Sequence, residues 1–249
     1  MKRIISITIA VCILFSTCVS LTVAATVTVA ENSYEKQIFE IMSNYDTNPE
    51  QAILELESID TVLVGKPVTI EHKHASKTKA TQPTDYSLTV YCTKRISSTI
   101  YHLQWLLKAN KTESKPGPID FVGLEWDTKY ASYYLSSGDG TYSTVAGRST
   151  GLVMFNLQDS DLKAGKSSYG TVEVNKIKSG TMEYGVKFSH NFKKYLISGS
   201  ATYSVSPSAS VSASGDFSLG LSNTKSFTVS VSSALDYWNL WNDNAVNIP

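Results

Sequence analysis

Residues 198–214 alternate strictly between small hydroxyl residues and mostly apolar residues. Every even position in this range is Ser or Thr, whereas the odd positions carry Gly, Ala, Tyr, Val or Pro. The same phase resumes after Gly215-Asp216 and continues to about Ser232. Because successive side chains of a strand point to opposite faces, a period of two predicts strands with one apolar face and one hydroxyl face. The larger apolar positions are Tyr203, Val205, Val211, Phe217, Leu219, Leu221, Phe227, Val229 and Val231.

Two kinds of structure fit this alternation. A membrane barrel needs strands of about 9–11 residues with apolar side chains outward and polar side chains inward, and in pattern residues 198–232 resemble the amphipathic stems of aerolysin-type toxins. One sheet of an ordinary sandwich that shows a Ser/Thr face to water fits as well. Pro207 disfavours both, because it lacks a backbone donor. A charge at Val211 or Val229 should abolish the membrane activity of a stem but unfold a sandwich strand.

The start of the chain predicts secretion. Met1-Lys2-Arg3 is followed by a largely apolar run to about Ala25. A basic start, an apolar centre and small residues at the end are typical of a signal peptide, so we expect residues 1–30 to be removed by cleavage after Ala25 or Ala30. An uncleaved membrane anchor and a lipid attached to Cys18 are the alternatives. The predicted location is extracellular.

The charge balance and the cysteine content of the chain argue against nucleic-acid binding and against an internal disulfide. The chain has 22 basic and 22 acidic residues, and cleavage would leave 20 basic residues against 22 acidic ones. A balance this close to neutral argues against nucleic acid as a partner. Cys92 would be the lone cysteine of the mature chain, so no internal disulfide is expected. It continues an apolar alternation with Leu88 and Val90, which predicts a buried, inert thiol.

The remaining chain divides into a helical part and a β part. Residues 31–60 carry apolar residues at helical spacing, with Asn48-Pro49 as a start signal for a second helix, and this segment is either a docked pair of helices or a removable pro-segment. Residues 61–249 are predicted to form a mostly β domain, an antiparallel β-sandwich preceded by the short helical segment. The clearest strands are expected at residues 87–93, 100–107, 119–126, 151–157, 169–174 and 181–192.

Three patterns bear on catalysis or metal binding. Glu125 and Asp127 carry two carboxylates at i and i+2, as a carbohydrate-active enzyme requires, but the third acid of the sandwich glucanase pattern is replaced by Tyr130. The Gly-Arg-Ser-Thr-Gly sequence at 147–151 matches a serine-hydrolase pattern but leads into a strand, not the helix that this pattern requires. The third pattern consists of Asn156, Asp159 and Asp161, whose side-chain oxygens could bind Ca²⁺. Calcium needs about six to eight oxygen ligands, more than these three residues supply. We therefore expect no enzyme, no cofactor and no resident metal.

Large aromatic residues gather near the end of the chain, at Tyr237, Trp238 and Trp241. Exposed, they would stack on sugar rings or lie at a lipid interface; packed inward, they would close the core. The leading hypothesis is a secreted, non-enzymatic β-sandwich protein that binds a glycan, protein or lipid at a cell or matrix surface. The alternative is a membrane-inserting, pore-forming protein that uses residues 198–232 as its hairpin, in which case it would act as an oligomer. A weaker alternative is a carbohydrate-active enzyme that uses Glu125 and Asp127.

Overall fold

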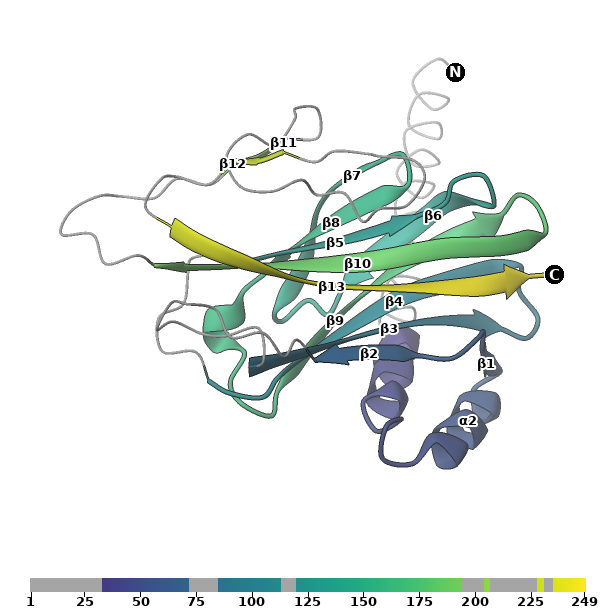
Figure 1. Ribbon diagram of the computed structural model, residues 1–249. Helices are drawn as coiled ribbons and strands as arrows, with labels where there is room; N and C mark the ends of the chain where they lie inside the picture. Colours follow the sequence, from purple (N-terminus) through teal and green to yellow (C-terminus); the bar gives the residue numbers. More distant parts are fainter. Residues whose placement is uncertain (1–32, 72–84, 113–119, 194–203, 207–227, 231–234) are drawn as a thin grey trace, which may run out of the picture.

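The chain folds into two antiparallel sheets that pack face to face, with two short helices at the start (Figure 1). In this computed structural model the described residues are 33–71, 85–112, 120–193, 204–206, 228–230 and 235–249. The predicted fold class, an antiparallel β-sandwich preceded by a short helical segment, is confirmed.

The first sheet has six strands in the order β1-β3-β4-β9-β6, with β2 also paired to β3. The strands are β1 (Thr61–Leu63), β2 (Val68–Glu71), β3 (Tyr86–Arg95), β4 (Ile100–Ala109), β6 (Ala131–Gly138) and β9 (Ser167–Lys176). Because β1 and β2 pair with successive parts of β3, they form one edge that is interrupted at residues 64–67. Gly65 lies in this interruption with a φ of 78°, a left-handed value that glycine adopts without steric penalty.

The second sheet has five strands in the order β13-β10-β5-β8-β7. The strands are β5 (Asp120–Trp126), β7 (Ser143–Ser149), β8 (Leu152–Leu157), β10 (Gly180–Lys193) and β13 (Leu235–Ile248). A separate short pair, β11 (Ser204–Ser206) with β12 (Thr228–Ser230), belongs to the chain that connects β10 to β13. The six strands predicted from the sequence agree with β3, β4, β5, β8, β9 and β10 to within about two residues at each end.

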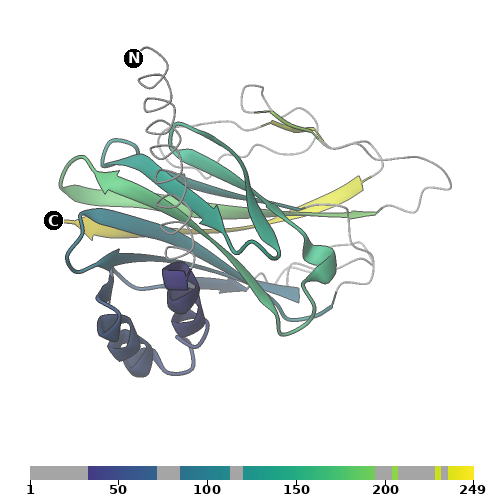
Figure 2. The same cartoon turned by 180° about the vertical axis from the view of Figure 1, so that it is seen from behind.

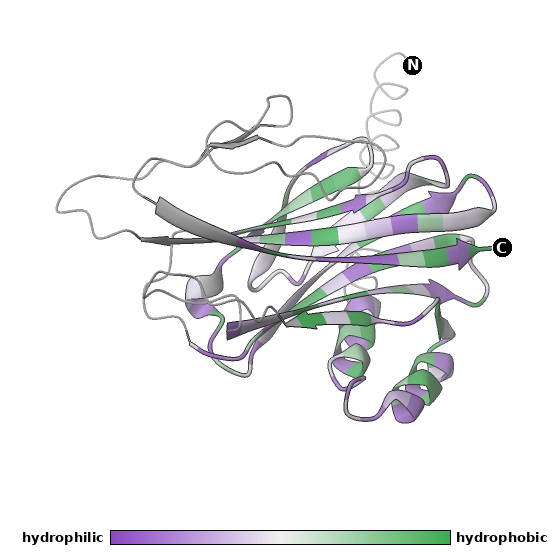
Figure 3. Cartoon of the chain, viewed as in Figure 1, coloured by the Kyte–Doolittle hydropathy of each residue, from purple (hydrophilic) through white to green (hydrophobic). Residues whose placement is uncertain are grey.

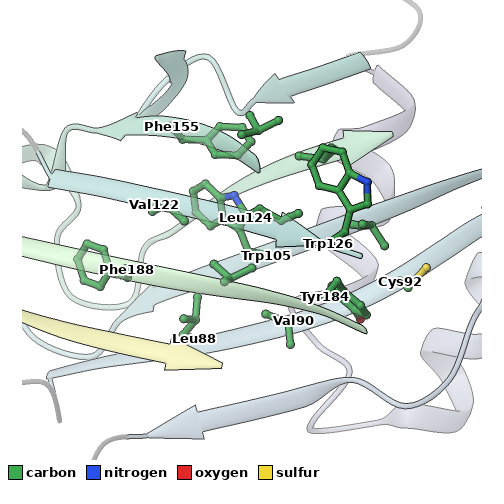
Figure 4. Packing of buried hydrophobic residues seen from close by; sticks show 14 of the residues in the cluster. Leu88, Val90, Cys92, Trp105, Val122, Leu124, Trp126, Phe155, Tyr184 and Phe188 are labelled. Carbon is green, nitrogen blue, oxygen red and sulfur yellow. The ribbon is translucent and has the colours of Figure 1, made fainter. Parts of the chain in front are cut away.

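Alternate side chains of the two sheets meet in one apolar core, as the alternation of apolar and polar residues along the strands shows (Figure 3). Trp105 lies at its centre, fully buried, with its ring edge-on to Phe155 at a centroid distance of 5.5 Å (Figure 4). Cys92 is fully buried in the same core, and burial raises the pKa of its thiol. The predicted burial of this thiol is confirmed.

The two helices cover the outer face of the first sheet (Figure 2). The first helix spans residues 33–42, and α2 (Pro49–Ser58) begins after Asn48, whose side chain accepts a hydrogen bond from the Gln51 amide at 3.3 Å. The predicted cap is therefore confirmed. The apolar side of the pair buries Ile38 and Leu56 against Tyr91 of β3. Docking of the helices on the sheet thus follows from their apolar spacing.

Gly170 of β9 gives a direct test of this core. It lies opposite Trp105, and a Cβ at position 170 would come within 2.6 Å of the indole nitrogen. Since that ring is fully buried, we expect Gly170→Ala to lower the free energy of unfolding by about 1–3 kcal/mol. Urea unfolding should show it, with Gly147→Ala as the matched control, because nothing lies within 4 Å of a Cβ there. Equal stability of the two variants would contradict this packing.

Candidate functional site

The longest uninterrupted pairing in the described structure joins β10 to β13. The pairing runs from Gly180 opposite Ile248 to Lys193 opposite Leu235. The antiparallel register is continuous over this length and contains no bulge. The neighbouring strand β5 pairs with β10 only as far as Ser189. His190 lies level with Asp120, the first residue of β5, so residues 191–193 of β10 extend past β5. Within the described residues β13 is their paired strand, and Figure 1 shows this two-stranded ribbon projecting from one end of the sandwich.

A buried polar contact anchors the base of this ribbon. The ring nitrogen Nδ1 of His190 lies 2.7 Å from Oδ2 of Asp120, and both side chains are fully buried. Tyr86 of the other sheet packs against the His190 ring at a centroid distance of 5.8 Å. The contact fixes β10 to the start of β5 at the point where the ribbon leaves the sheet.

The chain that follows the ribbon contains the Ser/Thr alternation. Within it, β11 and β12 pair so that Val205 lies opposite Val229, Ser204 opposite Ser230 and Ser206 opposite Thr228. Apolar positions therefore meet apolar positions, and hydroxyl positions meet hydroxyl positions, as a hairpin requires. The remaining predicted stem positions lie outside the described residues: Tyr203, Val211, Phe217, Leu219, Leu221, Phe227 and Val231.

The β11–β12 pair does not continue the register of the ribbon. Continued from Lys193 and Leu235, the ribbon register would place Asn223, not Val229, opposite Val205. The two pairings thus differ by six residues along one strand. This offset corresponds to a shift of about 20 Å.

A surface hollow lies at the other end of the sandwich, with a cavity volume of about 560 Å³. Its one charged residue is Arg148, exposed at the end of β7, whose guanidinium carbon lies 4.3 Å from the centroid of the Tyr133 ring. Trp126 is buried at the hollow and donates a hydrogen bond from Nε1 to the Ala131 carbonyl at 3.0 Å. The lining residues are Trp126, Thr128, Ala131, Ser132, Tyr133, Arg148, Ser149, Thr150, Gly151 and Ile177. An aromatic and basic hollow of this size suits a small ligand or head group.

Ser149, the serine of the hydrolase-like sequence, lines this hollow far from His190, the histidine that follows it in the chain. Ser149 ends β7, and a two-residue turn leads into β8, as the sequence predicts. The strand registers place Ser149 level with Gly185 of β10, three strands away in the same sheet. His190 lies five residues further along β10, a distance of about 17 Å along the strand. The structure does not bring these two residues together.

The paired carboxylates take different positions. Glu125 lies on β5 and is buried, whereas β5 ends at Trp126 and Asp127 belongs to the turn that follows. Oδ1 of Asp127 accepts a hydrogen bond from the Lys129 amide at 2.9 Å. The second carboxylate thus stabilises a turn. The sequence interpretation placed both carboxylates on one strand face, and this placement is wrong.

The other predicted site residues are dispersed. Asn156 is half-buried on β8, and Asp159 and Asp161 belong to the 3-10 helix that follows, Asp159–Asp161. The expectation that these three residues hold no resident metal stays a prediction. Trp241 on β13 is 51% exposed, whereas the side chains of Tyr237 and Trp238 lie outside the described structure. About half of the Trp241 surface is therefore exposed to solvent.

The structure also brings together three residues that sequence reasoning missed. Glu35, His102 and Glu173 lie far apart in the chain but meet beneath the first helix. No spacing motif links them in the sequence. In the described part of the chain, no helix is long and apolar enough to cross a membrane.

Comparison with known proteins gives distant similarities. No protein family and no curated protein matches the sequence. Among solved structures, a pore-forming protein is 8% identical over 74% of this chain and 90% of its own, with a TM-score of 0.35. The membrane-inserted form of the Clostridium perfringens NetB toxin is 8% identical over 74% and 96%, with a TM-score of 0.32. The sixth cohesin of Acetivibrio cellulolyticus scaffoldin B, solved with a mutant Cel5 dockerin, is 10% identical over 37% and 77%, with a TM-score of 0.29.

Proposed function

We propose that this protein inserts into membranes, with the chain between β10 and β13 as its transmembrane hairpin. The observation that carries the proposal is the bulge-free ribbon, which leaves the sandwich as two paired strands and leads into the Ser/Thr alternation from both sides. Because the two strands are already paired in register where they leave the sandwich, the ribbon can become longer without any change of fold. Each further residue pair adds to a ladder that already exists.

The ribbon register, carried forward through residues 194–234, sorts this sequence onto two faces. It would pair Ala209 with Leu219 and Val211 with Phe217 on one face, and hydroxyl residues with each other on most of the other. It would leave Ala213-Ser214-Gly215 as a three-residue loop. Glycine at the third position is what such a hairpin loop favours, because that residue adopts a left-handed conformation. The position of Gly215 in the loop thus agrees with the register of the β10–β13 pairing.

The length of this hairpin suits a bilayer. From Tyr203 to Ser212 the first strand has ten residues, against the roughly 9–11 that a tilted membrane strand needs. Tyr203 would lie opposite Lys225 at the boundary nearest the sandwich, and both side chains have an apolar body with a polar end that suits an interface. Within this hairpin the membrane-facing positions include five of the apolar residues predicted from the sequence, Val205, Val211, Phe217, Leu219 and Leu221. Asn223 shares their face near the boundary, and Phe227, Val229 and Val231 lie beyond it on the side of the sandwich.

One hairpin cannot span a membrane alone, because its two edges would expose unpaired backbone groups to lipid. We therefore propose an oligomer in which hairpins from several copies close a barrel with the Ser/Thr face toward the lumen. The activity needs no catalytic residue and no cofactor. It belongs to a secreted protein that acts on a target membrane.

Release of a dye from lipid vesicles tests this function. Residues 31–249, shown to be folded by circular dichroism, should release calcein from vesicles over some range of lipid composition and pH. A detergent-resistant oligomer should form at the same time. A folded protein that releases no dye from any of these vesicles would overturn the proposal.

We further propose that the hollow binds the surface ligand that brings the protein to its target, as the leading sequence hypothesis requires. This second proposal depends on the exposed Arg148, whose guanidinium stacks on the Tyr133 ring in a hollow that the buried Trp126 also lines. Arg148 would contribute a charged hydrogen bond to an anionic group of the ligand.

Arg148→Ala is therefore expected to reduce retention of fluorescently labelled protein on susceptible cells by about tenfold or more. Flow cytometry at subsaturating protein concentration measures it. Lys129→Ala is the matched control, because Lys129 lies over Tyr130 outside the lining of the hollow. Retention of the Arg148 variant at the wild-type level would exclude the hollow as the binding site.

A further inference from the structure

Three metal-ligating side chains meet between the first helix and the outer face of the first sheet. Glu35 comes from the helix at residues 33–42, His102 from β4 and Glu173 from β9, and the last two are direct cross-strand partners. One ligand atom of each residue lies within 4.8 Å of the corresponding atoms of the other two. Backbone pairing and helix docking thus fix all three positions.

The cluster is buried and contains an unsatisfied ring nitrogen. The exposed fractions of Glu35, His102 and Glu173 are 3%, 5% and 6%. Nδ1 of His102 is buried and has no hydrogen-bond partner within the described structure. A buried polar atom without a partner costs free energy, and a metal ion would give the imidazole a partner.

The charges point the same way. Two carboxylates held this close repel each other when both are ionised, so they favour a cation between them. Ser137 donates a hydrogen bond from Oγ to the Glu35 carboxylate, as outer-shell groups do for ligating carboxylates.

From this geometry we infer that Glu35, His102 and Glu173 bind a divalent transition-metal ion, Zn²⁺ first among them, which ties the first helix to the sandwich. One imidazole nitrogen and two carboxylates form a donor set that Zn²⁺ accepts, with a fourth position left for water. The imidazole makes Mg²⁺ a poor occupant, since that ion prefers oxygen ligands. The site goes beyond membrane insertion, because it lies on the other sheet and holds the helical segment in place.

Isothermal titration of metal-free protein tests the inference. The chain is residues 31–249 with His72 and His74 both changed to Ala, so that the histidine pair in the 72–84 connection cannot bind the ion. We expect one Zn²⁺ per chain, a higher melting temperature with Zn²⁺ but not with Mg²⁺, and slower amide hydrogen exchange over residues 33–42. Glu173→Gln should weaken Zn²⁺ binding by at least about tenfold, whereas Glu40→Gln, on the exposed side of the same helix, should not.

Cobalt provides a readout that does not depend on stability. Co²⁺ in the same site should give visible absorption bands that His102→Gln abolishes in a protein still folded by circular dichroism. Absence of Zn²⁺ binding by the metal-free chain would show that the carboxylates share a proton only, and would overturn the inference. Binding that is unchanged in both Glu173→Gln and His102→Gln would place the ion elsewhere and overturn it as well.

Discussion

A disulfide between positions 205 and 229 is expected to abolish dye release. In the structure Val205 of β11 lies opposite Val229 of β12, so Val205→Cys with Val229→Cys should form a bond under oxidising conditions. In the continued ribbon register these positions lie about 20 Å apart, whereas a disulfide tolerates Cα separations up to roughly 6.8 Å. The oxidised protein therefore cannot adopt the inserted register, and release of calcein from vesicles should fall to background.

Reduction supplies the internal control for this experiment. Dithiothreitol should restore release to the level of the two single-cysteine variants, which cannot form the bond within one chain. Cys92 does not interfere, because it is fully buried in the core. Undiminished release by the oxidised protein would show that β11 and β12 keep their pairing in the membrane, and the proposed change of register would be wrong.

Leu219→Lys is expected to have the second large effect. In the proposed hairpin Leu219 faces lipid near the middle of the bilayer, where a lysine costs about 2–4 kcal/mol per chain. The rate of dye release should therefore fall between about thirtyfold and several hundredfold. Urea unfolding of the soluble protein should change little, because the proposal assigns Leu219 to the hairpin and not to the core of the sandwich.

Ser218→Lys is the matched control, one residue away and on the face that would line the lumen. It adds the same charge to the same strand, but water in the lumen solvates it, so release should continue with altered ion selectivity. The opposite order, with Ser218→Lys inactive and Leu219→Lys active, would mean that the hydroxyl face meets the lipid. Loss of folding in both variants would assign residues 218 and 219 to the sandwich and contradict the hairpin.

Much of the fold could be predicted because it depends on periodicity. The alternation around Leu88, Val90 and Cys92 predicts a half-buried strand, and these residues do lie in the core. Asn48-Pro49 predicts a helix start, and Asn48 caps α2. Each of these inferences uses neighbours in the sequence, where local backbone geometry decides the outcome.

The edge strands were harder to predict. β6, from Ala131 to Gly138, is not among the strands that the sequence predicts, and its last residues include Ser136 and Ser137. Polar, partly exposed strands at the edge of a sheet carry little of the apolar signal that marks a central strand. The turn itself lies after them, where Oδ1 of Asp139 accepts hydrogen bonds from the amides of Thr141 and Tyr142.

The sites required information that a single sequence does not contain. The Glu35, His102 and Glu173 cluster depends on the β4–β9 register and on the docking of the first helix, and neither follows from spacing. The hollow likewise combines Tyr133 of β6 with Arg148 of β7. The hairpin is the opposite case: its faces were evident from the alternation, but the register that sets its turn came from the β10–β13 pairing.

Paired cysteines in the membrane-bound protein test the central claim most directly. The continued ribbon register places Ala209 opposite Leu219, whereas the β11–β12 register would place it opposite Lys225. On vesicles, the Ala209→Cys, Leu219→Cys protein should cross-link within one chain, and the Ala209→Cys, Lys225→Cys protein should not. Cross-linking of the second pair instead of the first would show that the ribbon does not extend into the membrane.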